Sequence, residues 1–186
     1  MDRGTLPPVT PDHLRDAAMT GAILALAATV WFGWAFQGSP RSWRAWLVAG
    51  LVPSYAILIG SAIVAVLHWG DGSVFDATTS TRFGILVGIE AALAALGAGI
   101  LARRRPDLVP VWIAVVVGVH FVPVAVLLHY PWLHVVAGLT TAAALAAVPV
   151  ARRTSQPVSA VTGVGLGLAL LIGGLVALGT ALTWQA

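Results

Sequence analysis

The sequence predicts an all-α integral membrane protein, a six-transmembrane-helix bundle built from three helical hairpins. The chain is 59% hydrophobic and only 9% charged, whereas an ordinary soluble domain carries roughly 25% charged residues. Its mean hydropathy is +0.92. Six apolar stretches also reach the roughly 20 residues that a helix needs to cross the hydrocarbon core of a bilayer. We therefore expect the 186 residues to form a single membrane domain with no soluble appendage.

The six predicted helices are separated by short segments rich in turn-forming residues. They span residues 17–36, 44–69, 83–102, 108–130, 131–150 and 158–184. The turns between them contain Gly38-Ser39-Pro40, Asp71-Gly72-Ser73, Pro106, Tyr130-Pro131 and Gln156-Pro157. The boundary between the fourth and fifth helices depends on Tyr130-Pro131 alone. The segment 1–16 contains three aspartates and three prolines rather than a basic region, so we expect an extracytoplasmic tail and not a signal peptide.

The basic residues predict how the bundle is oriented. All ten are Arg, which is typical of a GC-rich bacterial genome. Seven follow the first, third and fifth helices, namely Arg41, Arg44, Arg103, Arg104, Arg105, Arg152 and Arg153. The positive-inside rule places these seven in the cytoplasm, so both termini and the 70–81 loop are expected outside the bacterial cytoplasmic membrane. The tryptophans lie near the predicted interfaces, as anchoring residues do.

Several function classes are excluded by what the chain lacks. It has no Cys, so thiolate metal ligation, disulfides and thiol redox chemistry are excluded. It has no nucleophile elbow, no Asp-rich diphosphate motif and no P-loop. Gly163, Gly165 and Gly167 lie inside an apolar helix with no preceding strand, which argues against a dinucleotide site. The net charge of +3 comes from arginines at helix ends and does not indicate nucleic-acid binding.

Glu90 and His120 are ionisable residues near the middle of predicted membrane spans. An ionisable side chain facing lipid at the helix centre costs at least about 2.5 kcal/mol, so such residues usually face the protein interior. Glu90 lies eight residues after Arg82, and His120 lies ten residues before Tyr130. At about 1.5 Å per residue, both lie roughly 12–15 Å from the outer ends of their helices. We therefore expect the two side chains to approach within hydrogen-bonding reach, directly or through water.

Two further helices carry polar residues at seven-residue spacing. Ser54, Ser61 and His68 form a stripe on the second helix, and His134 and Thr141 form another on the fifth. A hydroxyl in such a helix often only bonds its own i−4 carbonyl. The alignment with histidines nevertheless favours a ligand-binding face on each helix.

We therefore expect the second to fifth helices to enclose one polar pocket. Glu90 and His120 would form its floor, and it would open outward past His68 and His134. The first and sixth helices lack ionisable residues at mid-membrane depth, so we expect them to pack around the outside.

A buried carboxyl group beside an imidazole suits several functions. Because the pair can exchange a proton near neutral pH, the leading hypothesis is a small transporter or ligand-binding membrane protein for a proton or a small molecule. One alternative is a membrane-embedded enzyme that uses Glu90 and His120 as catalytic acid and base on a lipid-soluble substrate. Another is a structural subunit in which the pair only joins two helices.

No cofactor is predicted, although the sequence leaves two possibilities open. Haem or a transition metal held by His68, His120, His134 and Glu90 is not excluded, since these residues offer nitrogen and oxygen ligands. No metal-ligand spacing such as H-x-x-x-H supports it.

The expected partners follow from the composition. They are the lipid bilayer and a small-molecule or proton substrate, without nucleic acid. The small-residue row of the sixth helix, beginning with Gly163 and Gly167, is suited either to packing within the bundle or to a homo-oligomer interface.

Overall fold

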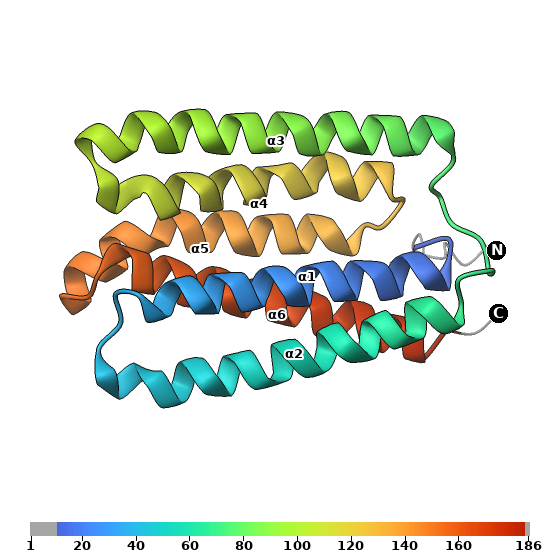
Figure 1. The fold of residues 1–186 in the computed structure, drawn as a ribbon, viewed down its shortest axis with the longest axis horizontal. Coiled ribbons are helices and arrows are strands. Elements are labelled where there is room, and N and C mark those ends of the chain that lie inside the picture. Colours follow the sequence, from blue (N-terminus) through green and yellow to red (C-terminus); the bar gives the residue numbers. More distant parts are fainter. Residues whose placement is uncertain (1–10, 185–186) are drawn as a thin grey trace, which may run out of the picture.

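The computed structural model describes residues 11–184, and every regular element among them is a helix. Six helices are long and apolar enough to cross a membrane, as the sequence predicts for a multi-spanning protein (Figure 1). They are α1 (Leu14–Phe36), α2 (Arg44–Leu67), α3 (Ala77–Arg104), α4 (Val109–Leu127), α5 (Trp132–Thr154) and α6 (Val158–Leu182). Two single-turn 3₁₀ helices, η1 (Arg41–Trp43) and η2 (Pro106–Leu108), precede α2 and α4.

The helix boundaries follow the predicted ones closely except at the start of α3. This helix begins at Ala77, six residues before the predicted start at 83. Asp76 is its N-cap, and the carboxylate accepts a hydrogen bond of 2.6 Å from the Thr79 backbone N–H. This bond satisfies one of the free N–H groups of the first turn. The helix therefore extends beyond the apolar residues that the hydropathy pattern detects.

The centre of the bundle is the contact between α1 and α6. Half of the residues in the most apolar window of each of these helices are buried. A Cβ built on Gly163 would lie 2.6 Å from the Trp31 carbonyl oxygen, and one built on Gly174 would lie 3.2 Å from the Gly21 carbonyl oxygen. Glycine at these positions lets the two backbones approach closely, which is how helices associate when both are apolar all round.

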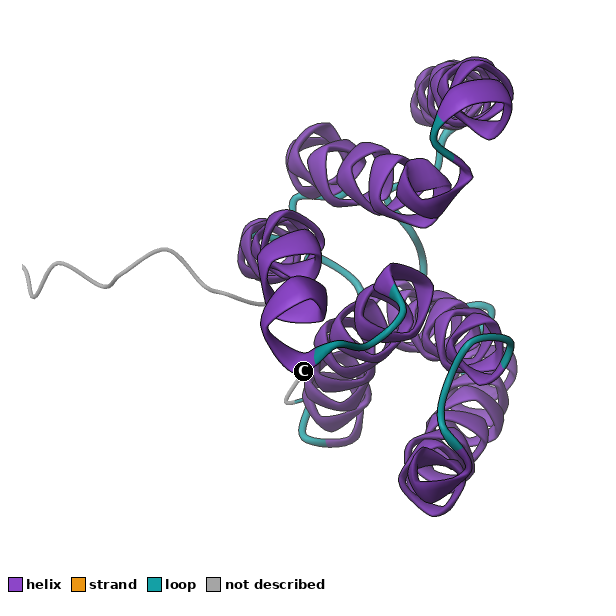
Figure 2. Cartoon of the chain, turned by 90° about the vertical axis from the view of Figure 1, so that its left-hand side faces the viewer, coloured by secondary structure: helices purple, strands orange, loops and turns teal. Residues whose placement is uncertain are grey.

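The other helices are arranged on either side of this contact. Helix α2 packs on α1 and α6, whereas α5 packs on α6, α4 packs on α5, and α3 packs on α4. Within residues 11–184, α2 and α3 share no contact, and they lie at opposite ends of the arrangement (Figures 1 and 2).

The expectation that the second to fifth helices enclose a common interior is therefore wrong. The expectation that the first and sixth helices pack around the outside is wrong as well. The physical reason is the row of small residues on α1, at Gly21, Ala25, Ala28 and Ala35, all of which are buried. Because this row packs on the glycine row of α6, the two helices occupy the centre and separate α2 from α3.

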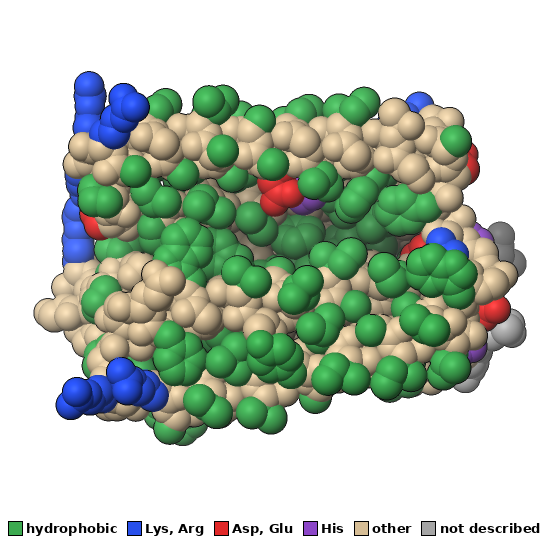
Figure 3. Space-filling model, viewed as in Figure 1, with side chains coloured by type: hydrophobic (Ala, Val, Ile, Leu, Met, Phe, Trp, Pro, Cys, Tyr) green, Lys and Arg blue, Asp and Glu red, His purple; other side chains and the backbone are tan. Residues whose placement is uncertain are grey.

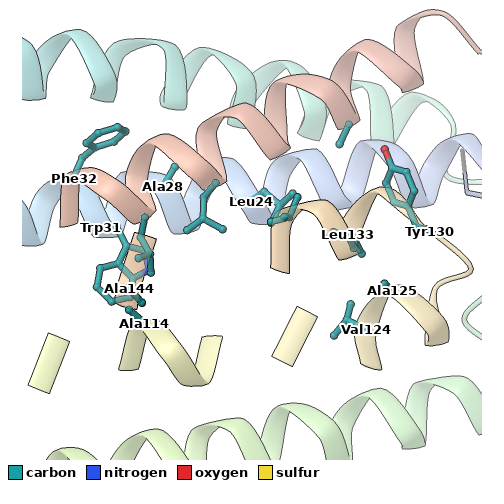
Figure 4. Packing of buried hydrophobic residues seen from close by; sticks show 14 of the residues in the cluster. Leu24, Ala28, Trp31, Phe32, Ala114, Val124, Ala125, Tyr130, Leu133 and Ala144 are labelled. Atoms are coloured by element: carbon teal, nitrogen blue, oxygen red, sulfur yellow. The ribbon is translucent and has the colours of Figure 1, made fainter. Parts of the chain in front are cut away.

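A cluster of larger side chains surrounds the α1–α6 contact. Leu24, Trp31 and Phe32 of α1 are at most 5% exposed. Figure 4 shows Trp31 beside Ala114 of α4 and Ala144 of α5, and all of these residues belong to one continuous hydrophobic cluster. Phe32 also lies against Gly50 and Gly167, where a Cβ would come within 3.0 Å of its ring. The aromatic ring thus fills the space that two glycines leave between α1, α2 and α6.

Helix α3 is the least enclosed element, since none of its residues is buried and the only long helix that it contacts is α4. Trp112 of α4 joins the two, because its Nε1–H donates a hydrogen bond of 2.9 Å to the Leu93 carbonyl. The indole lies directly against Gly97, and a Cβ there would overlap the ring. The contact between Trp112 and α3 therefore requires glycine at position 97.

We expect Gly97→Ala to displace Trp112 and to lower the free energy of unfolding by about 1–3 kcal/mol, as overpacking does. Gly99→Ala is the matched control two residues away, because no atom lies within 4 Å of its Cβ position. Thermal unfolding of both variants in the same detergent measures the difference. Equal midpoints for the two variants would contradict the role assigned to Trp112.

Candidate functional site

The structure brings Glu90 and His120 together, as the sequence predicts. The Nε2 atom of His120 lies 3.4 Å from Oε2 of Glu90. This separation is within ion-pair distance and slightly longer than the roughly 2.7–3.2 Å of a usual hydrogen bond. The His120 side chain is 9% exposed and that of Glu90 is 22% exposed. The imidazole is therefore enclosed by the protein, whereas the carboxylate is partly accessible.

The position of the pair follows from the antiparallel packing of α3 and α4. Glu90 lies 13 residues after Ala77 and 14 before Arg104, at the centre of α3. The hydrogen bond from Trp112 to Leu93 fixes the register of the two helices on the side toward Arg104. Since α4 runs in the opposite direction, His120 reaches the same level as Glu90 two turns after Trp112.

The pair lies in a groove of about 280 Å³ formed by α3 and α4 alone. All other residues that line this α3–α4 groove are apolar: Leu86, Ile89, Leu93, Val115, Val116, Val119 and Pro123. In Figure 3, acidic and histidine side chains appear together in a hollow between α3 and α1, near the middle of the molecule. The groove thus opens on the side of the bundle. The expectation of a pocket that opens at the outer end, past His68 and His134, is wrong.

The two imidazole nitrogens of His120 have different surroundings. Nε2 faces Glu90, whereas Nδ1 is buried without a hydrogen-bond partner among residues 11–184. The neutral tautomer with its proton on Nε2 directs a donor at the carboxylate and leaves only the lone pair of Nδ1 unsatisfied. An imidazolium would instead bury an unpaired N–H group, which is costly. The geometry therefore favours a neutral His120 whose Nε2 proton points toward the Glu90 carboxylate.

The serines of the predicted α2 stripe do not join this site. Ser54 is fully buried, and its hydroxyl donates to its own i−4 carbonyl, that of Gly50, at 2.8 Å. Ser61 is also fully buried, next to Gly21 of α1. Their assignment as ligand-binding residues with Glu90 is wrong, because α2 packs on α1 and α6 and has no contact with α3 or α4.

The remaining predicted residues are dispersed as well. His68 caps the end of α2 and pairs with Asp71, with Nδ1 2.6 Å from Oδ2. His134 is exposed on the first turn of α5. Thr141 packs against Gly118, so it belongs to the interface between α4 and α5. None of the three lines the α3–α4 groove.

The candidate metal ligands are not gathered into one cluster. Within residues 11–184, no three His, Asp or Glu side chains lie close enough together to hold a metal ion. His68 lies at the end of α2 and His134 on α5, and these helices share no contact. Haem ligation stays a prediction, for which a Soret band in the visible spectrum of the purified protein is the test.

Arg15 and Asp16 were not among the predicted site residues. They attach the α2–α3 connection to the start of α1. Asp16 is 4% exposed, and its two oxygens accept hydrogen bonds from the Ser73 hydroxyl at 2.6 Å and the Val74 N–H at 2.8 Å. Arg15 donates from Nη1 to the Trp69 carbonyl at 3.0 Å. The signal in the sequence is Asp16 itself, because a carboxylate in the first turn of an apolar helix needs hydrogen-bond partners when it is buried.

Comparison of the chain with protein-family models, with curated proteins and with solved structures found no match in any of the three.

We expect Asp16→Asn to release the 68–76 connection, because an amide presents an acceptor to only one of the two donors. Losing a hydrogen bond to a buried carboxylate costs about 1.5–3 kcal/mol. Limited proteolysis within this connection and the thermal midpoint measure the effect. Asp71→Asn is the control in the same connection, since Asp71 is exposed and pairs only with His68. Equal cleavage of both variants would contradict the role of Asp16.

Proposed function

We propose that this chain is a membrane protein that binds a lipid-soluble ligand in the α3–α4 groove, with Glu90 and His120 as the polar anchor. The observation that carries the proposal is a partly accessible carboxylate at the centre of an otherwise apolar groove. A ligand with an apolar body and one hydroxyl or amine group matches this lining, because ligand pockets combine apolar walls with a few polar groups that set orientation. The ligand would enter from the side of the bundle.

The exposure of Glu90 distinguishes this proposal from a purely structural role. A pair that only joins two helices gains most when both partners are fully enclosed, since water and lipid then cannot compete. Here Glu90 retains 22% exposure, and the groove beside it approaches the roughly 300 Å³ at which small-molecule pockets begin. Trp112 already joins α3 to α4 one to two turns away, so a second polar link is not needed to hold them.

A second candidate is acid–base catalysis on a lipid-soluble substrate at the same place. It is favoured by the separation of 3.4 Å between Nε2 and Oε2, because a carboxyl group and an imidazole this close together can act as base and acid on one substrate. A proton-coupled transporter would load and release its proton at the same two groups. Both require that the ligand first occupies the groove, so binding is the step to test.

We also propose a topology for the chain in a bacterial cytoplasmic membrane. The six helices form three hairpins, α1–α2, α3–α4 and α5–α6, with both termini outside. Each of these pairs is in contact, and basic residues gather at the end of the bundle where α1, α3 and α5 terminate (Figure 3). Short loops rich in Arg favour the cytoplasmic side.

The topology is tested by single cysteines, since the natural chain has none. Gln37→Cys and Thr154→Cys lie at the arginine-rich end and Thr78→Cys lies at the other, and all three positions are exposed. We expect a membrane-impermeant thiol reagent to label only position 78 in intact cells, and all three positions after the membrane is permeabilised. Labelling of 37 and 154 but not 78 in intact cells would reverse the orientation.

The ligand site is tested with a photoreactive long-chain alcohol as the probe. We expect it to crosslink to residues 86–93 and 115–123 in the purified protein, detected by mass spectrometry of peptides. Glu90→Gln is expected to lower this labelling about tenfold, because a hydrogen bond to a charged group contributes about 1.5–3 kcal/mol. Leu93→Trp fills the groove and is expected to abolish labelling.

The matched control is Leu96→Trp, which adds the same bulk to an exposed position of α3 outside the groove. Labelling that is unchanged in both Glu90→Gln and Leu93→Trp would contradict the proposed site. A lower thermal midpoint for Glu90→Gln with unchanged labelling would instead assign the pair a structural role.

A further inference from the structure

A second recess lies where the bundle ends at the α2–α3 connection. Its volume is about 290 Å³, and it is lined by α1, α3, the α2–α3 connection and the turn that follows α4. The walls are mainly apolar and include Met19, Ile23, Phe75, Phe83 and Leu128. The other lining residues are Arg15, Asp16, Thr20 and Trp69. We call this recess the loop-end pocket.

We propose that the loop-end pocket binds the anionic headgroup of a membrane amphiphile, with the acyl chain against the apolar walls. The guanidinium of Arg15 would hold the anionic oxygens. This site is separate from Glu90 and His120 and does not rest on the function proposed for them.

Arg15 is held in place, and its charge has no ion-pair partner among residues 11–184. Nη1 donates to the Trp69 carbonyl at 3.0 Å, and Cζ lies 4.6 Å from the centre of the Trp69 ring. These contacts fix the plane of the guanidinium. No carboxylate among residues 11–184 lies within ion-pair distance of it. The neighbouring Asp16 is engaged by Ser73 and Val74 instead.

A fixed guanidinium with free donors at the edge of an apolar recess matches an amphiphilic anion. The remaining N–H groups of Arg15 form a planar fork that suits phosphate and carboxylate oxygens. Trp69 lies where indole rings usually meet lipid headgroups. The pocket is also lined by Phe83, three residues before Leu86 of the α3–α4 groove, and by Leu128, five residues after Pro123 of the same groove. An acyl chain can therefore extend from the pocket along the same side of the bundle (Figure 3).

Two kinds of molecule combine an anionic headgroup with an acyl chain, namely an anionic phospholipid and a free fatty acid. The test uses the purified full-length protein and native mass spectrometry to count bound molecules. In one arm the protein is titrated with phosphatidylglycerol against phosphatidylcholine, and in the other with oleate against oleyl alcohol. Preferential binding of either anion supports the site, and the arm in which it appears identifies the source.

Substitutions then locate the site. Arg15→Gln is expected to lower the preference for the anion about tenfold, as expected for losing a charge-assisted hydrogen bond. Arg82→Gln is the matched control, because Arg82 is an exposed arginine at the same end of the bundle that does not line the pocket. An equal loss in both variants would show diffuse surface charge and would overturn the proposal, as would no loss in either.

A third variant separates binding from folding. Ile23→Trp adds bulk inside the pocket while Arg15 stays intact, and position 23 is 52% exposed, so the larger side chain has room. We expect a weaker preference for the anion at an unchanged thermal midpoint. Full binding by Ile23→Trp would overturn the assignment of the acyl chain to this pocket, even if Arg15→Gln proved unstable.

Discussion

The close approach of α1 and α6 is the constraint on which the rest of the bundle depends. Gly163 and Gly174 place their backbone against that of α1: a Cβ on Gly163 would collide with the Trp31 carbonyl oxygen and with Ala35, and one on Gly174 would lie tightly against the Gly21 carbonyl oxygen. In a bilayer, apolar surface alone does not favour one helix neighbour over another, so packing of this kind decides which helices are central. Helix α2 packs on one side of the α1–α6 pair, and α5, α4 and α3 follow in order on the other.

The site exists because this arrangement leaves α3 at an edge. With α4 as its only long-helix neighbour, α3 exposes the groove in which Glu90 meets His120. The helix is nevertheless attached at three places. The Asp16 carboxylate holds the connection that precedes it, Asp76 caps its first turn, and Trp112 packs on Gly97 near its other end. Such an element can carry a polar group near the middle of its length without opening the buried core, because α3 contributes no buried residue to that core.

The two recesses on this side of the bundle differ in chemistry. The α3–α4 groove holds Glu90 and His120 among apolar side chains, so the ligand proposed for it carries a single polar group that is uncharged or basic. The loop-end pocket holds an arginine whose charge is not balanced within residues 11–184. A preference for an uncharged or basic group at Glu90 and for an anionic group at Arg15 would orient an amphiphile along the helices. Its anionic end would lie at the α2–α3 connection.

The amino-acid sequence by itself determined the number of helices, their approximate boundaries and the matching positions of Glu90 and His120 along α3 and α4. These properties follow from hydropathy, from Pro and Gly in the turns and from the fixed rise per residue, all of which are local. It did not determine which helices neighbour each other, so Ser61 and His134 were assigned to a site that they do not reach. Every helix here is apolar all round, and hydropathy therefore does not specify which face turns inward. Only the tertiary structure decided that, through the fit of Gly163 and Gly174 against α1 and of Trp112 against Gly97.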